Sequence, residues 1–501
     1  MIVQDTLARL KARLATINDL DSAQALLGWD QHTYMPRGSL EPRVRQMATL
    51  QSLSHGMLSA PETVELVTAL EAKRDQLEPL DARLVVVARR DLDQALRLPA
   101  ELVARKAEAT GRCLDAWMEH KPSSAYEAWR PSLEEVFAIV KEEAEALGYT
   151  DQPYDALLHR FEPGLPTRRL QAIFAELREG LVPLAKEIFA RAERVDDSFL
   201  HEPFDPDGQW KLTLELLEAM GYDFRHGRQD RSPHPFTTGF GIGDVRVTTR
   251  IHERDVRAGL FGSLHEGGHA LYEQNIDPRF DRGPLAQGSS LGIHESQSRL
   301  WENLVGRSRP FWERWFPEMK HRFPAPLEGV GFQRFYEGIN RVKPSLIRVE
   351  ADEVSYSLHI FVRFELELEL LGGNLALKDL PGAWNDKMRD TLGVTPATHA
   401  EGCMQDMHWA DASVGYFPTY ALGNLYGVMI FNQAKAELPD LDDQIRSGQL
   451  GALKAWLTEK VYRHGRSLDP GEILHGATGR ELTPQPFLAY VREKYGDIYG
   501  F

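Results

Sequence analysis

Apolar residues recur every three or four positions along most of this chain, which is the period of a helix with one buried face. The first segment repeats in this way over residues 7–20, and a longer run follows Pro166 and Thr167, which suit a helix start. Further helices are expected near residues 81–108, 132–146, 256–275, 293–305 and 450–464. The pattern therefore predicts a mainly α-helical protein.

Two segments depart from this pattern. Residues 237–243 are rich in Gly, and residues 244–250 alternate and carry β-branched side chains, which predicts a small hairpin just before the helix at 256–275. Such a hairpin could offer an edge strand to an extended peptide, or could be purely structural. Residues 364–370 alternate like a strand, but the length and Leu/Glu content of 351–371 favour helix.

Composition fits one large enzyme domain rather than a basic or membrane-bound protein. The 501 residues are 42% hydrophobic and 26% charged, enough for a sizeable core, and neither a repeat nor a low-complexity linker divides residues 1–501. The net charge of −16 argues against nucleic acid or an anionic membrane as partner. Two cysteines, no signal pattern and no long apolar run lead us to expect a cytoplasmic location.

The most informative stretch runs from His265 to His269 and reads H-E-x-x-H. Residues four apart share one face of a helix, so the two imidazoles can bind one Zn²⁺ ion. Glu266 lies beside that face, where it can take a proton from a metal-bound water. The alternative interpretation is an amphipathic helix with solvated histidines.

A catalytic zinc site needs a third protein ligand, and the next helix supplies a candidate. Glu295 would project from that helix toward the first and complete a His₂Glu set. In the alternative interpretation, Glu295 and Glu302 are ordinary surface carboxylates. His294 competes as a ligand, but neighbouring helical residues point about 100° apart, so His294 and Glu295 cannot easily reach one ion together.

The chain resembles the carboxypeptidase Taq family, the thermostable metallocarboxypeptidases, because six motifs of that family occur here in order. Besides the H-E-x-x-H motif, they are HPF at 234–236, DxRxT at 244–248, HES/GQ at 294–297, IRxxAD at 347–352 and GxxQDxHW at 402–409. No motif position departs from the family pattern. Trp29-Asp30-Gln31 and Met35-Pro36 also look familiar, with less specificity.

The resemblance implies a helical fold with a deep groove between two halves, similar to neurolysin and angiotensin-converting enzyme. It also implies removal of C-terminal residues from peptides with broad specificity, a homodimer, and one divalent metal per chain, Zn²⁺ or Co²⁺. His265, His269 and Glu295 as ligands and Glu266 as general base follow from ligand chemistry and agree with the family.

Peptide hydrolysis passes through an oxyanion that needs hydrogen-bond donors. His408 and Tyr420 are the candidates, because related helical metallopeptidases use a His and a Tyr at similar spacing. His408 could instead be a buried structural histidine, and Tyr420 a packing residue. Trp409 is expected to pack, and Asp406 could orient a neighbouring group.

A carboxypeptidase must also bind a free α-carboxylate, for which the planar fork of Arg is suited. Arg348 is preferred because it is expected to head a long helix, and Arg246 is the second candidate. Each could instead pair internally, for example with Asp352 or Asp244. The HPF segment that starts at His234 could help to close one end of the groove.

Two other functions compete with this interpretation. A helical oligopeptidase that cuts internally would use the same ligands, and a substrate with an amidated C terminus would distinguish it. A non-catalytic peptide-binding protein with a relict site is the third candidate, but the intact Glu266 argues against it, because a binding module has no use for a general base.

Overall fold

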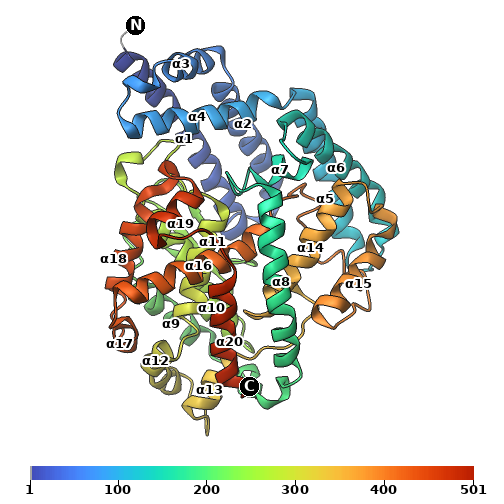
Figure 1. Cartoon of the computed structure of the whole chain (residues 1–501), viewed down its shortest axis with the longest axis vertical. Coiled ribbons are helices and arrows are strands. Elements are labelled where there is room, and N and C mark those ends of the chain that lie inside the picture. The colour runs from blue at the N-terminus through green and yellow to red at the C-terminus, as the bar shows by residue number, and fades with distance from the viewer. Residues whose placement is uncertain (1–2) are drawn as a thin grey trace. The chain divides into compact units, whose positions relative to one another are not determined.

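A computed structural model describes residues 3–501 and confirms the mainly helical prediction (Figure 1). Two compact units are formed, each from three segments of the chain. The first unit takes the chain up to Leu96, Asp197–Ile339 and Ile430–Arg480, and the second takes Arg97–Asp196, Asn340–Met429 and Glu481–Phe501. No described helix is both long and apolar enough to cross a membrane.

The first unit holds the predicted metal-binding helix and the small sheet. Its main helices are α1 (Val3–Thr33), α2 (Leu40–Leu58), α3 (Pro61–Glu71), α4 (Pro79–Arg97), α9 (Pro206–Met220), α10 (Val256–Gln274), α11 (Leu291–Arg299), α12 (Arg309–Arg322), α13 (Phe332–Ile339), α17 (Leu441–Arg446), α18 (Gly451–Lys460) and α19 (Pro470–Thr478). Helix α11 continues directly into a π-helix, η6 (Leu300–Val305). The helix expected over 81–108 is in fact two helices, because Pro99 directly precedes the next helix and ends the run.

The second unit is built around a buried helix and its neighbours. Its main helices are α5 (Ala100–His120), α6 (Tyr126–Leu147), α7 (Pro153–Leu158), α8 (Thr167–Phe189), α14 (Ser355–Leu371), α15 (Leu380–Leu392) and α20 (Gln485–Tyr499), and α16 (Pro418–Glu437) begins in this unit. Helix α14 confirms the helical interpretation of the ambiguous segment. Most of its residues are buried, so the alternating Leu and Glu positions reflect a helix enclosed on most sides rather than a strand with one wet face.

A three-stranded sheet with the order β1-β3-β2 lies against α10. Strand β3 (Val245–Thr249) is central, with β1 (Gln229–Arg231) parallel to it and β2 (Thr237–Gly239) antiparallel. Strands β2 and β3 form the predicted hairpin. Val245 and Val247 are buried, as expected for the β-branched residues of a central strand. Among the described strands, β2 pairs with β3 alone, so it forms one edge of the sheet.

Candidate active site

Helix α10 carries His265, Glu266 and His269, and its start is well defined. The Asp255 side chain accepts a hydrogen bond from the Arg257 backbone N–H at 3.1 Å, which caps the helix. Both histidines are partly exposed, whereas Glu266 is buried. The spacing of four residues therefore presents two imidazoles on one face, as the sequence predicts.

Helix α11 crosses α10 so closely that only glycine fits at the crossing point. A Cβ atom at Gly268 would lie 2.5 Å from the carbonyl oxygen of Gln297 and 2.6 Å from the Cα of Ser298. Glycine inside a helix costs about 1 kcal/mol relative to alanine, so the close approach explains its presence here. The Ser290 side chain caps α11 by accepting from the Ile293 N–H at 3.0 Å.

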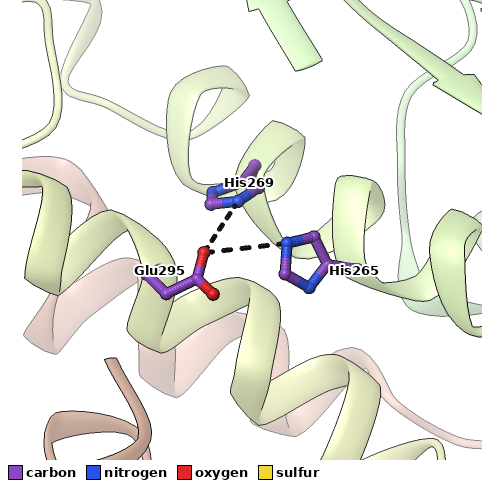
Figure 2. A group of neighbouring side chains, drawn as sticks. All are labelled: His265, His269 and Glu295. Carbon is purple, nitrogen blue, oxygen red and sulfur yellow. Dashed lines mark ion pairs between the residues drawn. The ribbon is translucent and has the colours of Figure 1, made fainter. Parts of the chain in front are cut away.

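The crossing brings His265, His269 and Glu295 together, as Figure 2 shows. One donor atom from each residue lies within 4.8 Å of the others. The Glu295 Oε2 atom is 3.7 Å from His265 Nε2 and 3.5 Å from His269 Nε2. Ligands about 2.1 Å from a tetrahedral Zn²⁺ ion are separated by about 3.4 Å, so this donor set fits such an ion.

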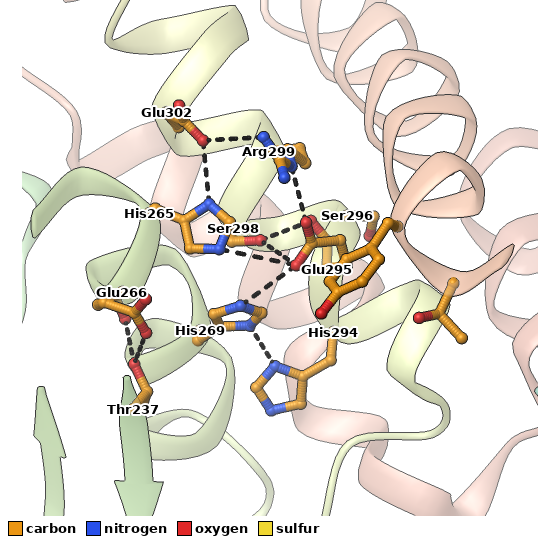
Figure 3. A network of polar contacts seen from close by, with 12 residues as sticks. Thr237, His265, Glu266, His269, His294, Glu295, Ser296, Ser298, Arg299 and Glu302 are labelled. Atoms are coloured by element: carbon orange, nitrogen blue, oxygen red, sulfur yellow. Dashed lines mark hydrogen bonds and ion pairs between the residues drawn. The ribbon is translucent and has the colours of Figure 1, made fainter. Parts of the chain in front are cut away.

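Charged partners surround the three donors in Figure 3. Arg299 Nε donates to Glu295 Oε1 at 2.7 Å, and the Glu302 carboxylate lies 2.9 Å from His265 Nδ1. Burial alone would raise the pKa of Glu295, but Arg299 and the two histidines outweigh it and hold that pKa well below its usual range. The Glu295 carboxylate is therefore ionised across the neutral pH range.

Glu266 points away from that donor group and toward strand β2 (Figure 3). Thr237 Oγ1 donates to Glu266 Oε2 at 2.7 Å and also lies 2.9 Å from the Glu266 backbone carbonyl. Burial raises the pKa of Glu266, although His265 and Thr237 oppose the shift. A carboxylate whose pKa is raised by burial is a stronger base than an exposed one, which suits proton abstraction.

His294 is not a member of this group of three donors. Its side chain turns to the other ring nitrogen of His269, and its Nδ1 lies 2.6 Å from His269 Nδ1. Neighbouring residues on a helix point in different directions, as the sequence predicts, so His294 and Glu295 approach different nitrogens of His269. Arg299 and Thr237 were not assigned from the sequence. The spacing of Arg299, four residues after Glu295, is the one signal that could have pointed to its ion pair.

In the second unit, His408 and Tyr420 form a contact of their own. His408 Nε2 lies 3.2 Å from the Tyr420 hydroxyl, and the His408 ring stacks on Phe417. Burial lowers the pKa of His408 to about 4, so the imidazole is neutral at neutral pH. Trp409 is buried and donates from Nε1 to Glu367 at 2.9 Å, in keeping with a packing role.

The prediction that Arg348 heads a long helix is wrong. Arg348 sits in a short 3₁₀ turn, η7 (Arg348–Glu350), separated from the start of α14. Its internal partner is Asp406, which accepts from Arg348 Nε at 2.9 Å and from Nη2 at 2.8 Å. Asp352 instead accepts from three backbone N–H groups, those of Lys343, Val354 and Ser355. The Asp352 carboxylate therefore stabilises the backbone around the start of α14.

Asp406 is shared by two arginines. Arg363 Nε donates to its second carboxylate oxygen at 2.7 Å, and Arg348 Nη1 also donates to the Tyr356 hydroxyl at 2.9 Å. Burial would raise the pKa of Asp406, but the two guanidinium groups hold it well below its usual range. Two positive charges against one negative charge leave this cluster with one unit of positive charge. Asp406 therefore orients Arg348, as the sequence suggested for a neighbouring group.

Arg246 and His234 lie in and beside the small sheet. Arg246, on β3, is paired with Asp244 through two hydrogen bonds of 2.9 and 2.8 Å, as the internal-pairing alternative predicted. Its guanidinium also lies over the rings of Trp29 and Phe240. His234 is exposed, and its backbone carbonyl accepts from the Ser232 hydroxyl. These contacts indicate that Arg246 mainly stabilises the sheet.

Comparisons with known proteins agree with these motifs. The profile of the carboxypeptidase Taq (M32) metallopeptidase family matches residues 9–495. Thermostable carboxypeptidase 1 of Thermus thermophilus is 44% identical over 96% of each chain, and carboxypeptidase 1 of Bacillus subtilis is 38% identical over 97% of each.

Solved structures show the same fold. The crystal structure of the M32 carboxypeptidase from Deinococcus radiodurans matches with a TM-score of 0.97 and 40% identity, over 99% of this chain and 100% of that one. The metallocarboxypeptidase 1 structure from Trypanosoma cruzi matches with a TM-score of 0.95 and 34% identity, over 98% and 99%. Family membership implies a divalent metal. This chain belongs to the carboxypeptidase Taq (M32) family of metallopeptidases and is a metal-dependent carboxypeptidase.

Proposed function

We propose that this chain removes C-terminal residues from peptides with broad specificity, with Glu266 as the general base. The observation that carries the proposal is the convergence of His265, His269 and Glu295 beside a buried Glu266. These three residues would hold one divalent ion, for which we propose Zn²⁺, with Co²⁺ as a possible substitute, because His₂Glu is a ligand set of catalytic zinc. A divalent ion bound there supplies Lewis-acid polarisation of the scissile carbonyl and of the attacking water.

The remaining chemistry belongs to the side chains. Glu266 accepts a proton as the water oxygen bonds to the carbonyl carbon, and it returns that proton to the amine nitrogen as the carbon–nitrogen bond breaks. Thr237 holds the Glu266 carboxylate through a 2.7 Å hydrogen bond and so fixes its direction. The edge strand β2, which carries Thr237, is also where we propose that the substrate backbone adds to the sheet.

His408 and Tyr420 are proposed to stabilise the oxyanion. Both are hydrogen-bond donors in their neutral forms, and burial keeps His408 neutral at neutral pH. Their mutual 3.2 Å contact keeps the two groups together. Because this contact uses one of the two donor protons, it must open for both groups to donate to the oxyanion.

Replacing His408 by Ala or Tyr420 by Phe is expected to lower kcat much more than it raises KM. Loss of one oxyanion donor costs about 2.7–4 kcal/mol of transition-state stabilisation, or about 10²–10³ in kcat. Steady-state kinetics on one peptide, for both variants and the wild type, measures the changes in kcat and KM separately. An effect confined to KM would place these residues in ground-state binding and remove them from this role.

Arg348 is proposed to bind the α-carboxylate of the substrate. Its cluster with Arg363 and Asp406 carries a surplus positive charge, and Asp406 and Tyr356 fix the direction of its guanidinium. A substrate carboxylate would neutralise the surplus positive charge of this cluster, and a buried charge without a counter-charge is unfavourable. Arg246 is the second candidate, and the HPF segment at His234 is proposed to help close one end of the groove.

Wild-type enzyme is expected to prefer a free C terminus over an amidated one by roughly 2–5 kcal/mol in kcat/KM, because an amidated peptide lacks the anion that would neutralise the surplus positive charge of this buried cluster. Arg348→Ala should remove this preference, and Arg348→Lys should restore it in part, since lysine lacks the planar fork. The measurement is kcat/KM on a matched peptide pair, with thermal unfolding of each variant as the control for folding. If Arg246→Ala loses the preference while Arg348→Ala keeps it, the assignment passes to Arg246.

Three further predictions rest on the family resemblance and on composition. They are a groove between two halves of one domain over residues 1–501, a homodimer, and a cytoplasmic location. Sedimentation velocity of the purified protein tests the dimer, and a monomer at micromolar concentration would contradict it. Cell fractionation tests the location. Metal analysis of protein purified without added metal tests the choice of Zn²⁺.

The whole proposal is tested by incubating a mixed peptide pool with the protein and identifying the products by mass spectrometry, with and without a chelator. Stepwise loss of C-terminal residues that stops in the chelator supports it. Internal fragments would favour an oligopeptidase, and an unchanged pool with metal bound would favour a peptide-binding protein.

A further inference from the structure

The second ring nitrogen of His269 has a partner that the proposed reaction does not use. Its Nδ1 lies 2.6 Å from Nδ1 of His294, and Nε2 of His294 lies 3.0 Å from Oε1 of Glu273 (Figure 3 shows the first of these contacts). We infer that His294, held by Glu273, is a positioning residue that fixes which nitrogen of His269 presents a lone pair to the metal. This inference rests on the ligand set proposed above.

Donors and acceptors alternate along this chain of contacts. A carboxylate only accepts hydrogen bonds, so Glu273 requires the proton of a neutral His294 ring on Nε2. Nδ1 of His294 then carries a lone pair and accepts from Nδ1–H of His269. That leaves the lone pair of His269 on Nε2, the atom 3.5 Å from Glu295 Oε2. The two contacts therefore select the one neutral form of His269 that can bind a cation through Nε2.

Two glycines leave space for the side chains of His294 and Glu273. A Cβ atom at Gly288 would lie 2.6 Å from Cδ2 of His294, and a Cβ atom at Gly239 would lie 2.2 Å from Oε2 of Glu273. The Tyr272 ring also packs beside His294, with centroids 5.2 Å apart. A side chain at either glycine would displace His294 or Glu273 from this chain of contacts, here called the His269–His294–Glu273 relay. The backbone of β2 and of the loop before α11 therefore contributes to the geometry of the relay.

The two histidine ligands are therefore supported differently. His265 meets the Glu302 carboxylate directly at 2.9 Å, whereas His269 reaches Glu273 through an intervening imidazole. Partners that orient a metal-binding histidine commonly change metal affinity by about 10–100-fold when they are removed. We expect an effect of this size from His294, which is large enough to measure without any assay of activity.

The test compares Zn²⁺ dissociation constants of the full-length protein, measured by competition with a chelator of known affinity. His294→Phe keeps a ring beside Tyr272 but has no acceptor, and should weaken binding about 10–100-fold. His294→Asn loses the ring but places an amide oxygen near the position of Nδ1, and should retain most of the affinity. His321→Ala, which removes an exposed histidine on α12, is the matched control and should bind as the wild type does.

Glu273→Gln tests the relay without touching His294. A glutamine amide can donate as well as accept, so it no longer selects the His294 proton position, and weaker Zn²⁺ binding is expected. Wild-type affinity in this variant or in His294→Phe would overturn the inference, and so would binding by His294→Asn that is as weak as that of His294→Phe.

His269→Ala, measured in the same series, separates the inference from the ligand assignment. If it keeps stoichiometric Zn²⁺, the ligand set itself is wrong. If it loses Zn²⁺ while His294→Phe binds normally, only the positioning role fails. If His294→Phe loses Zn²⁺ as completely as His269→Ala, His294 is a ligand and the positioning role is wrong.

Discussion

Replacing Glu266 by Gln is expected to lower kcat by about 10²–10⁴-fold while the protein keeps its metal. The amide keeps the size of the side chain and can still interact with Thr237, but it cannot accept the proton of the attacking water. Because Glu266 is buried and separate from the three donor atoms, its loss leaves those donors in place. Steady-state kinetics and metal analysis on the same preparation measure both effects.

A matched control for this variant is Glu253→Gln, which removes an exposed carboxylate shortly before α10 and should leave kcat unchanged. Wild-type turnover in Glu266→Gln would remove Glu266 from the mechanism. A loss of metal together with activity would mean that Glu266 supports the ligand geometry rather than the proton transfer.

Replacing His269 by Ala is expected to abolish stoichiometric metal binding and, with it, activity. The donor set contains three residues, and two remaining donors from different helices give a much weaker site. A ligand that binds only the folded state also stabilises that state, so a chelator should lower the Tm of the wild type but not that of His269→Ala. Metal content after dialysis and thermal unfolding with and without a chelator are the measurements.

Full metal content in dialysed His269→Ala would show that the ligand assignment is wrong. The same series can include Glu295→Gln, which keeps the side-chain volume on α11 and removes the charge. It should lose most of its metal, because a neutral amide is a poorer ligand for a divalent ion than a carboxylate.

The sequence was most informative where function depends on local spacing. The H-E-x-x-H spacing predicts helix α10 and the shared face of His265 and His269, and ligand chemistry then points to Glu295 on the next helix. The close crossing at Gly268, which brings the donors within reach of one another, depends on packing between helices. No local pattern encodes it.

Contacts between distant parts of the chain could not be predicted. Arg348 and Asp406 are 58 residues apart, and Asp352, which the sequence offered as an alternative internal partner, accepts from backbone N–H groups instead. The same limit applies to Thr237, which reaches Glu266 from a strand 29 residues earlier. Pairings of this kind depend on the tertiary fold and become visible only when the helices and strands are assembled.

The most direct test of the central claim compares two peptides of identical sequence, one with a free C terminus and one amidated, with the metal-loaded wild-type enzyme. The account predicts stepwise loss of single residues from the free peptide, much slower cleavage of the amidated peptide, and no cleavage of either in the presence of a chelator. Equal cleavage of both peptides, or cleavage that persists after the metal is removed, would contradict it.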